Sequence, residues 1–398
     1  MSEFPGLPRQ AAFTTTLGAS SPAAPLPCYR ALDDAGRVVE GGEPLAARVS
    51  EEDALRMYGC MIKLQAMDAI FYEAQRQGRF SFYMTAMGEE ANNVGSAAAL
   101  DDGDVVFAQY REAGVLLWRG WQMGQFADQC FGNERDQGKG RQMPVHYGDA
   151  SLNFHTISSP LATQLPQAVG AAYGLKMEGS KNLAVAYFGD GAASEGDFHA
   201  AVNFAATLEV PMLFICRNNG WAISTPTSDQ FRGDGIAGRA GAYGLRAVRC
   251  DGNDALAVRE AVAFARAQAI ETGEALVVEC MTYRSGHHST SDDSSRYRAS
   301  SEIAHWKTAR DPVQRFRAAL VEQGWWDDER EKAARKAARR EVVKALDEAE
   351  GAPKPGVGEM FADVYHEQPP YIKEQEQEML ALVRRFPAHY EAAKNKVH

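Results

Sequence analysis

Two short polar motifs, each following an apolar run, carry the chemistry that this sequence suggests first. Gly189-Asp190-Gly191 follows the run Asn182 to Phe188, and Asn218-Asn219-Gly220 follows the run Pro211 to Cys216. The helical pattern from Asp197 to Leu208 lies between them, which predicts a strand, helix, strand unit. Because ligands bind beyond the carboxyl ends of parallel strands, we expect the two motifs to face one another.

A phosphate group and a divalent cation together explain these residue types. The backbone after Gly191 opens toward a helix, whose first turn offers free N–H groups and the positive end of a dipole. Asp190 would repel a bare phosphate, but a magnesium ion between them removes the conflict. We therefore predict Asp190 and the side-chain oxygen of Asn219 as ligands of a magnesium ion that holds a diphosphate. Either motif alone would be a simple tight turn.

Two other classes of function have to be weighed. The segment from Gly189 to Ser194 resembles the glycine-rich fingerprint of a nucleotide-binding oxidoreductase. However, the second strand ends in Arg217 where an NAD site needs an acidic residue, and Asp190 would repel an unshielded pyrophosphate. A catalytically silent scaffold is the other alternative, and the intact set of Asp190, Asn219 and His288 argues against it.

The elements that must position these motifs predict an α/β fold with a parallel sheet covered by helices on both faces. Residues 1–50 are rich in Pro, Gly and Ala and predict an extended N-terminal arm that needs another surface to order it. Residues 51–310 form the predicted α/β domain, and residues 311–398 a helical C-terminal region. The charged stretch from Asp327 to Glu350 is expected to be a solvated helix face.

The composition of the chain limits which partners it can bind and which cellular compartment it suits. The 398 residues carry a formal net charge of -11, which argues against affinity for nucleic acid or anionic membranes. No window is apolar enough for a membrane span, and the start lacks a secretory signal. The six cysteines form no CxxC pair, so we expect free thiols. The start is not rich in arginine, so a mitochondrial presequence is either absent or already removed, and this does not separate cytosol from matrix. We expect the mitochondrial matrix if the chain is eukaryotic and the cytoplasm if it is bacterial.

The motifs also resemble a known family. A Gly-Asp-Gly followed at this distance by Asn-Asn is similar to the thiamine-diphosphate motif of transketolase-like and 2-oxoacid dehydrogenase enzymes. Three further segments closely resemble alpha subunits of branched-chain 2-oxoacid dehydrogenases, namely Gln109 to Gly114, Ile157 to Gln164 and Gly286 to Asp293. The similarity runs from about Tyr29 to the final helix, and it implies the thiamine-diphosphate-binding fold.

The resemblance implies a set of cofactor-binding positions. They are Tyr110, Arg111, Ser159, Leu161, Asp190, Gly191, Ala192, Arg217, Asn219, Trp221 and His288. Magnesium would bind Asp190, Asn219 and the backbone carbonyl of Trp221, where the family more often has tyrosine. A monovalent cation, usually potassium, would bind a loop made of Ser158, Pro160, Thr163 and Gln164.

The resemblance also implies catalytic, substrate and regulatory residues. His288 would reach the phosphate and the reacting end of the cofactor, and an imidazole there can donate a hydrogen bond or transfer a proton. Phe82, Gln109 and Leu161 would line the aliphatic part of the substrate pocket. Ser289 matches the site at which a dedicated kinase inactivates eukaryotic members.

The implied activity is the oxidative decarboxylation of branched-chain 2-oxoacids in branched-chain amino acid catabolism, with transfer of the acyl group to a lipoyl-bearing acyltransferase. In this family a beta subunit supplies the glutamate that activates the cofactor, so an alpha2-beta2 heterotetramer is expected, with a kinase and phosphatase as further possible partners. Pyruvate enzymes usually carry Gly-His-Ser-Met-Ser-Asp in the loop after Ser285, whereas this chain has Gly-His-His-Ser-Thr-Ser-Asp-Asp. That difference favours branched-chain substrates over the alternative of a pyruvate or acetoin dehydrogenase.

Overall fold

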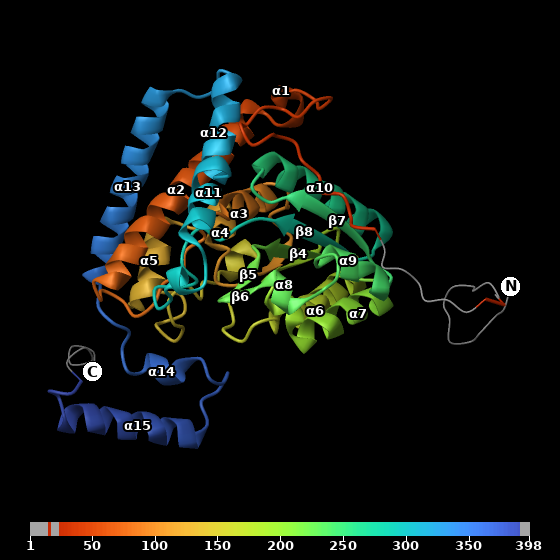
Figure 1. Ribbon diagram of the computed structural model, residues 1–398. Coiled ribbons are helices and arrows are strands. Elements are labelled where there is room, and N and C mark those ends of the chain that lie inside the picture. The colour runs from red at the N-terminus through yellow and green to blue at the C-terminus, as the bar shows by residue number, and fades with distance from the viewer. Residues whose placement is uncertain (1–14, 17–23, 391–398) are drawn as a thin grey trace.

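A parallel sheet lies at the centre of the computed structural model, which describes residues 15, 16 and 24–390 (Figure 1). Its six strands lie in the order β2-β1-β3-β4-β8-β7, and every neighbouring pair is parallel. The strands are β1 (Val105–Phe107), β2 (Phe154–His155), β3 (Ala184–Gly189), β4 (Met212–Asn218), β7 (Arg246–Asp251) and β8 (Leu276–Met281). A separate antiparallel pair consists of β5 (Trp221–Ala222) and β6 (Thr225–Pro226).

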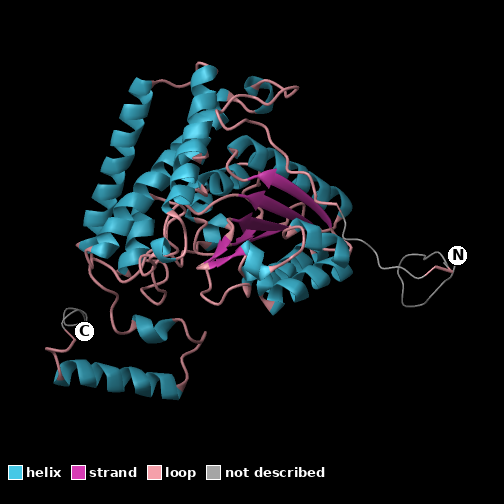
Figure 2. Cartoon of the chain, viewed as in Figure 1, coloured by secondary structure: helices cyan, strands magenta, loops and turns pink. Residues whose placement is uncertain are grey.

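Burial on both faces of the sheet explains why its strands are continuous apolar runs. Along β3, Val185 and Tyr187 belong to the core on one face of the sheet. Ala186 and Phe188 belong to the core on the other face, as side chains that alternate along a strand must. Helices cover each of these two cores (Figure 2). The predicted fold class is therefore confirmed.

The helices divide between these two faces. One core is built with α6 (Gln164–Met177), α7 (Gly196–Leu208) and the short α9 (Ala237–Ala240). The other is built with α2 (Glu51–Arg76), α3 (Glu90–Ala97), α4 (Ala113–Trp118), α5 (Met123–Phe131) and α10 (Ala255–Thr272). Short helical segments elsewhere are α1 (Leu45–Arg48), α8 (Thr227–Gln230), and the 3₁₀ turns 150–152, 192–194, 241–243 and 294–296.

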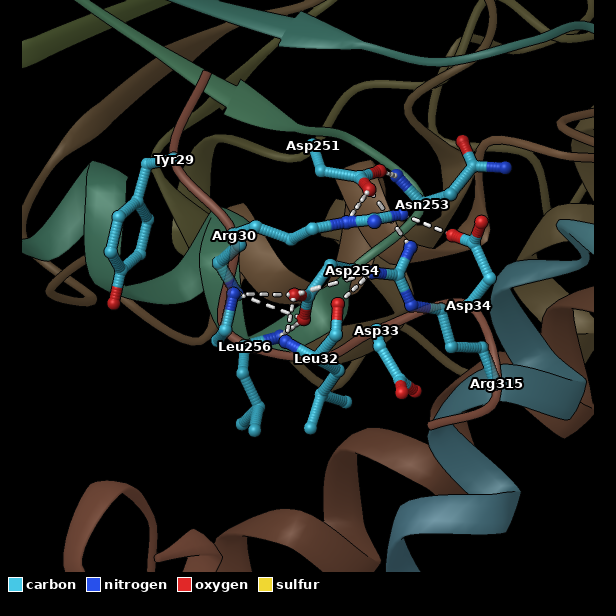
Figure 3. A network of polar contacts seen from close by, with 12 residues as sticks. Tyr29, Arg30, Leu32, Asp33, Asp34, Asp251, Asn253, Asp254, Leu256 and Arg315 are labelled. Carbon is cyan, nitrogen blue, oxygen red and sulfur yellow. Dashed lines mark hydrogen bonds and ion pairs between the residues drawn. The ribbon is translucent and has the colours of Figure 1, made fainter. Parts of the chain in front are cut away.

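The N-terminal arm is ordered by the edge strand β7. The amide of Tyr29 donates to the carbonyl of Arg249, and the amide of Asp251 donates to the carbonyl of Tyr29, both at 2.9 Å. Asp254, just beyond β7, then accepts from the amides of Ala31 and Leu32 at 2.8 and 2.6 Å (Figure 3). The described part of the arm therefore packs on the sheet edge, whereas the assignment of residues 1–50 as an extended arm stays a prediction; residues 1–14 and 17–23 lie outside the described residues.

The C-terminal region adds α11 (Ser300–Ala309), α12 (Pro312–Glu322), α13 (Asp328–Glu350), α14 (Glu359–Ala362) and α15 (Pro370–Arg385). The prediction that the charged stretch Asp327 to Glu350 is only a solvated face is wrong for one side of α13, where Val342 and Leu346 are buried in the same core as α2. Small residues spaced along that side allow the close packing. The division at residue 311 stays a prediction, since α12 contributes to this core too.

Three further findings concern the described residues. No helix there has both the length and the apolar character needed to cross a membrane. All six cysteines are free thiols, as predicted, although Cys250 and Cys280 lie on adjacent strands with their sulfurs 3.6 Å apart. Figure 1 shows α14 and α15 at one end of the molecule, apart from the sheet.

Candidate active site

Five loops meet at the carboxyl edge of the sheet, one after each of the neighbouring strands β2, β1, β3, β4 and β8. They enclose a cavity of about 220 Å³. The cavity is lined by Gln109, Tyr110, Arg111, Leu161, Gly189, Asp190, Gly191, Ala192, Glu195, Arg217, Asn219, Trp221, Ala222, Ile223, Arg284 and His288. The chain leaves β1 toward β2 on one side and returns to β3 on the other, and such a switch point in an open sheet is where ligands bind.

Asp190 is a buried carboxylate with no cation beside it. Its side chain is 1% exposed, accepts from the Asn219 amide at 3.3 Å, and accepts from Nε2 of Gln230 at 2.9 Å. None of the ion pairs in the described part of the chain includes it, and burial raises the pKa of its carboxyl above the ordinary value. A negative charge in this position is compensated only by amide donors, so a bound cation would stabilise it.

The groups next to Asp190 offer oxygen atoms that could coordinate a metal ion. Asn219 places its Oδ1 3.1 Å from the Trp221 amide and donates from Nδ2 to Glu89 at 2.9 Å. The Trp221 carbonyl accepts from Arg284 at 3.3 Å. Within the described residues no group of three or more His, Cys, Asp or Glu side chains could hold a metal ion. A cation here would therefore bind one carboxylate, an amide oxygen, a carbonyl and ligand oxygens, a set that suits magnesium.

Two buried arginines give the opposite wall of the cavity a positive charge. Arg111 and Arg284 are 2% and 1% exposed, and neither forms an ion pair with another described residue. Their guanidinium groups donate to main-chain carbonyls instead, including those of His288 at 2.7 Å and Ile223 at 2.8 Å. Burial and the nearby charge of Arg111 lower the pKa of Arg284 to about 10. An anion bound between them would relieve both effects.

His288 lies between these arginines, and they fix its tautomer. Its Nδ1 is 3.1 Å from Arg111 and 3.3 Å from Arg284. Guanidinium nitrogens only donate, so Nδ1 must accept and the proton of the neutral ring belongs on Nε2. Burial, followed by the charges of Arg111 and Arg284, lowers the pKa of His288 to about 3. The ring is therefore neutral near pH 7 and offers one N–H donor.

Arg217, at the end of β4, lines the cavity and connects the loops around it. It pairs with Glu89 at 2.7 Å and with Glu112, and it donates to Oε1 of Gln109 at 3.2 Å. That same oxygen accepts from the Gly189 amide at 3.1 Å, so the loops after β1, β3 and β4 share one polar network. Nε2 of Gln109 is buried and has no partner among the described residues, which leaves a donor for a ligand.

Several residues of this network were not predicted from the sequence. Glu89, Glu112 and Gln230 hold Arg217, Asn219 and Asp190, yet no motif marked them. Glu112 stands inside the segment from Gln109 to Gly114, so the resemblance covered it without giving it a role. The need of a buried arginine for carboxylates is a usable signal, but the sequence does not show which carboxylates are near.

The other predicted site residues lie around the cavity rather than in its wall. In the loop predicted to bind potassium, Thr163 donates to the carbonyl of Pro160 within the loop, and Gln164 donates to the carbonyl of Tyr187 on β3, both at 2.9 Å. Ser158 begins this loop, and of residues 158–164 only Leu161 lines the cavity, so Ser159 does not. Phe82 is half-buried against the core and does not line the cavity. Ser289, next to His288, is 8% exposed.

Strained backbone occurs beside the cavity. Ile223 and Ala162 have φ angles of 55° and 66°, in the left-handed region that side-chain-bearing residues rarely adopt. Ile223 lines the cavity, and Ala162 directly follows Leu161, which also lines it. Such strain persists only where the surrounding structure holds it, and it is common at ligand sites.

Comparison with known proteins agrees with this geometry. Residues 58–358 match the family model described as dehydrogenase E1 component. The chain is 56% identical over 365 residues to "2-oxoisovalerate dehydrogenase subunit alpha 2, mitochondrial" of Arabidopsis thaliana, covering 92% of this chain and 77% of that protein. It is 52% identical over 365 residues to the corresponding alpha subunit of Homo sapiens, covering 92% of this chain and 82% of that protein. The alpha subunit of Dictyostelium discoideum is 50% identical over 366 residues, with 92% and 82% covered.

Proposed function

Since this chain belongs to the dehydrogenase E1 component family, we propose that it is the alpha subunit of a branched-chain 2-oxoacid dehydrogenase. With a beta subunit it decarboxylates branched-chain 2-oxoacids oxidatively and passes the acyl group to the lipoyl group of an acyltransferase. The relatives that carry the name 2-oxoisovalerate dehydrogenase support the branched-chain assignment over the pyruvate or acetoin alternative.

One observation carries the cofactor assignment. A single cavity contains a buried carboxylate without a cation, Asp190, and two buried guanidinium groups without a carboxylate, Arg111 and Arg284. Folded chains rarely leave charges of both signs buried and unpaired, because each costs several kcal/mol. A metal ion together with a diphosphate supplies both missing partners. The nicotinamide alternative explains the arginines but leaves Asp190 uncompensated.

The residues present fit thiamine diphosphate held through magnesium. Asp190, Asn219 and the Trp221 carbonyl would bind magnesium, while Arg111 and Arg284 would bind diphosphate oxygens. The remaining cofactor contacts of the proposal are Tyr110, Ser159, Leu161, Gly191, Ala192, Arg217 and His288. A potassium ion in the loop of Ser158, Pro160, Thr163 and Gln164 would stabilise the segment that carries Ser159 and Leu161. When bound, thiamine diphosphate would supply a nucleophilic carbon for the keto carbon of the substrate and a cationic ring that accepts the electron pair left by decarboxylation.

Residues of the chain itself would then position the cofactor and the substrate. Arg111 and Arg284 orient His288 through its Nδ1, so its Nε2–H is the donor that remains for a bound ligand. Because its pKa is about 3, His288 serves as a hydrogen-bond donor near pH 7 and gains basicity when an anion offsets the arginines. Gln109 and Leu161 line the cavity and are proposed substrate contacts, and Phe82, which packs against the core outside the lining, is the third residue of the proposed substrate pocket.

Partners and location follow from the same proposal. The beta subunit completes an alpha2-beta2 heterotetramer, which the lipoyl-bearing acyltransferase joins in a multienzyme complex. The relatives named above are called mitochondrial, which supports the matrix as the location if this chain is eukaryotic. A bacterial chain would act in the cytoplasm.

Ser289 is the proposed regulatory residue. The loop that carries it is fastened by Thr290, whose amide donates to the Tyr83 carbonyl at 3.0 Å and whose hydroxyl accepts from the Tyr83 amide at 3.2 Å. Because Ser289 is buried, a kinase would reach it only after this loop leaves Tyr83. A phosphate there would lie near Asp292 and Asp293 and would repel them.

The assignment is tested by removing the charge of Asp190. We expect Asp190→Ala to weaken magnesium-dependent binding of thiamine diphosphate by more than the roughly 10- to 100-fold that loss of an outer-shell partner costs. Calorimetric titration of the assembled protein measures this affinity. Asp229→Ala removes an exposed carboxylate on the neighbouring α8 and should leave it unchanged. Equal affinity in the Asp190 and Asp229 variants would contradict the metal assignment.

A further inference from the structure

Gln230 holds the carboxylate of Asp190 from outside the cavity. Nε2 of Gln230 donates to Oδ2 of Asp190 at 2.9 Å, while the amide of Asn219 donates to Oδ1 at 3.3 Å. Asp190 and Asn219 line the cavity, whereas Gln230 does not. Any role of Gln230 in binding a metal ion is therefore exerted through its direct contact with Asp190.

The contacts of Gln230 determine which way its side-chain amide faces. Nε2 lies 2.9 Å from the Asp190 carboxylate and 3.2 Å from the Thr225 carbonyl, and an ionised carboxylate and a carbonyl only accept. A flipped amide would place Oε1 against two other oxygens. In the observed orientation Oε1 is buried and has no partner among the described residues, which is unfavourable. The amide therefore directs its donor at Asp190 although its own oxygen stays unsatisfied.

The β5-β6 pair brings the chain back from Asn219 to Asp190. The pair packs directly on the loop after β3, because a Cβ atom added to Gly191 would lie only 2.7 Å from Cβ of Ala222. The short helix α8 follows β6 without an intervening residue, and Gln230 is the last residue of α8. Asn219 and Gln230 therefore lie at the two ends of one short segment that closes on Asp190.

The donor that Gln230 supplies is neutral, and this determines what else Asp190 can bind. A lysine or arginine in the same place would pair with the carboxylate and supply the cation that it lacks. An amide fixes the direction of the carboxylate through one hydrogen bond and leaves its negative charge uncompensated. Hydrogen-bonding partners of this kind commonly orient the carboxylates that bind metal ions. The carboxylate of Asp190 thus remains available to a cation from solution.

We propose that Gln230 is a positioning residue that orients the Asp190 carboxylate toward the divalent cation and leaves its negative charge for that cation. This inference rests on the proposed function, in which Asp190 and the Trp221 carbonyl are magnesium ligands. Trp221 begins β5, and Gln230 ends α8. A cation bound to Asp190 and Trp221 would therefore connect both ends of the segment from β5 to α8, and it should restrict the motion of α8.

Two substitutions of Gln230 separate the direction of the Asp190 carboxylate from its charge. Gln230→Met keeps an unbranched side chain of similar length and removes the donor. Gln230→Lys keeps a donor and adds the positive charge that the amide lacks. Ser228→Ala is the matched control, because Ser228 lies on the same short helix and its side chain is exposed.

Calorimetry measures the affinity of the assembled protein for magnesium in the presence of thiamine diphosphate, and thermal unfolding measures the midpoint without either ligand. We expect Gln230→Met to weaken the magnesium affinity about 10-fold, as loss of a partner that orients a metal ligand commonly does. Gln230→Lys should weaken it by more than about 100-fold and raise the midpoint of the ligand-free protein, because the lysine takes the place of the cation beside Asp190. Ser228→Ala should change neither quantity.

A purely structural role of Gln230 in α8 predicts a different pattern, in which both variants lower the midpoint and weaken magnesium binding alike. That pattern would overturn the proposal. Wild-type magnesium affinity in either Gln230→Met or Gln230→Lys would overturn it as well.

Tryptic cleavage at Arg232 provides a second measurement. Arg232 is exposed and lies two positions beyond the end of α8. Magnesium and thiamine diphosphate at saturating concentrations should slow cleavage at Arg232 in the wild type and in Ser228→Ala. They should slow it much less in Gln230→Met, in which α8 has lost its link to Asp190. Equal protection of Gln230→Met would show that the metal ion does not act on α8 through Gln230.

Failure of this inference is distinguishable from failure of the proposed function. If Asp190→Ala abolishes magnesium-dependent binding while Gln230→Met binds like the wild type, only the role of Gln230 is wrong. If Asp190→Ala binds normally, the metal site itself is wrong. Thermal midpoints show which variants are folded, and if Gln230→Met is not, the magnesium affinity of Gln230→Lys still decides the outcome.

Discussion

Asp68, on α2, is another buried carboxylate, held by a residue that also contacts the His288 loop. It accepts from the Tyr83 hydroxyl at 2.9 Å and from the Ala86 amide at 2.6 Å, and it is 1% exposed. Burial raises the pKa of Asp68 to about 7, and the donors offset this only partly. Tyr83 also accepts a hydrogen bond from the amide of Thr290 in the His288 loop. Asp68 is therefore connected to this loop through Tyr83.

Asp68 should make stability fall as the pH rises. The carboxyl is protonated in folded and unfolded chains below its unfolded pKa of 3.8, and it ionises in the unfolded chain first. Stability is therefore lost between about pH 4 and 7, by roughly 4 kcal/mol at most at 1.4 kcal/mol per pKa unit. We expect the thermal midpoint of Asp68→Asn to rise relative to the wild type from pH 4 to pH 8. The exposed Glu73→Gln on the same helix should show no such trend.

Whether a contact in the site could be predicted depended on how far apart its two residues lie in the sequence. Asp190 and Asn219 follow neighbouring strands of one crossover unit, so spacing alone predicted that they meet. Glu89 is 128 positions from Arg217, and Gln230 reaches Asp190 from the segment after the β5-β6 pair. Contacts of that kind depend on how whole elements pack, which neither periodicity nor local motifs record.

At the level of elements, strand length decided what the sequence could predict. β3 and β4 have six and seven residues and appeared in the sequence as apolar runs. β1 and β2 have three and two residues, too few to show a period, and they were not predicted. β1 is paired with β3 from Val105 to Phe107, and this register places Gln109 to Arg111 at the cavity.

Asp254 fastens the N-terminal arm while it also caps a helix. It accepts from Leu256 and Ala257, both at 3.1 Å, at the start of α10, and from the two arm amides shown in Figure 3. Arg315 of α12 lies beside it at 3.6 Å, and pairs with Asp251 at 3.0 Å. One carboxylate therefore connects the arm, the sheet edge and the C-terminal helices.

We expect Asp254→Ala to lower the thermal midpoint more than a lost helix cap alone would, and to speed tryptic cleavage at Arg30 and Arg37. The matched control is Asp311→Ala, because Asp311 caps α12 through two amides at 2.9 and 2.8 Å and holds no arm residue. Losing a cap costs about 1 kcal/mol, whereas Asp254 also leaves two buried arm amides without partners. Equal midpoints and cleavage rates in the two variants would show that the arm is held by other contacts.

At the scale of the whole molecule, the charged groups that line the cavity indicate whether this chain alone could form a complete active site. Of the residues that line it, only Asp190 and Glu195 carry carboxylates. Asp190 is assigned to the metal, and Glu195 is an exposed residue at the start of α7. Apart from Asp190, the residues that line the cavity therefore include no buried carboxylate that could serve the other half of the proposed cofactor. This fits the proposal that a beta subunit completes the site.

The last prediction follows from that division. The chain without its beta subunit should show no oxidative turnover of 4-methyl-2-oxopentanoate or 3-methyl-2-oxobutanoate, even with saturating thiamine diphosphate, magnesium and an electron acceptor, because the activating carboxylate is missing. Adding the beta subunit should restore turnover to the wild-type chain but not to Asp190→Ala, which shows that both halves are needed. The assay follows carbon dioxide release and reduction of the acceptor, with the beta subunit alone as a further control. Full turnover by a preparation free of beta subunit would mean that this chain contains a catalytic acid outside the cavity at the sheet edge.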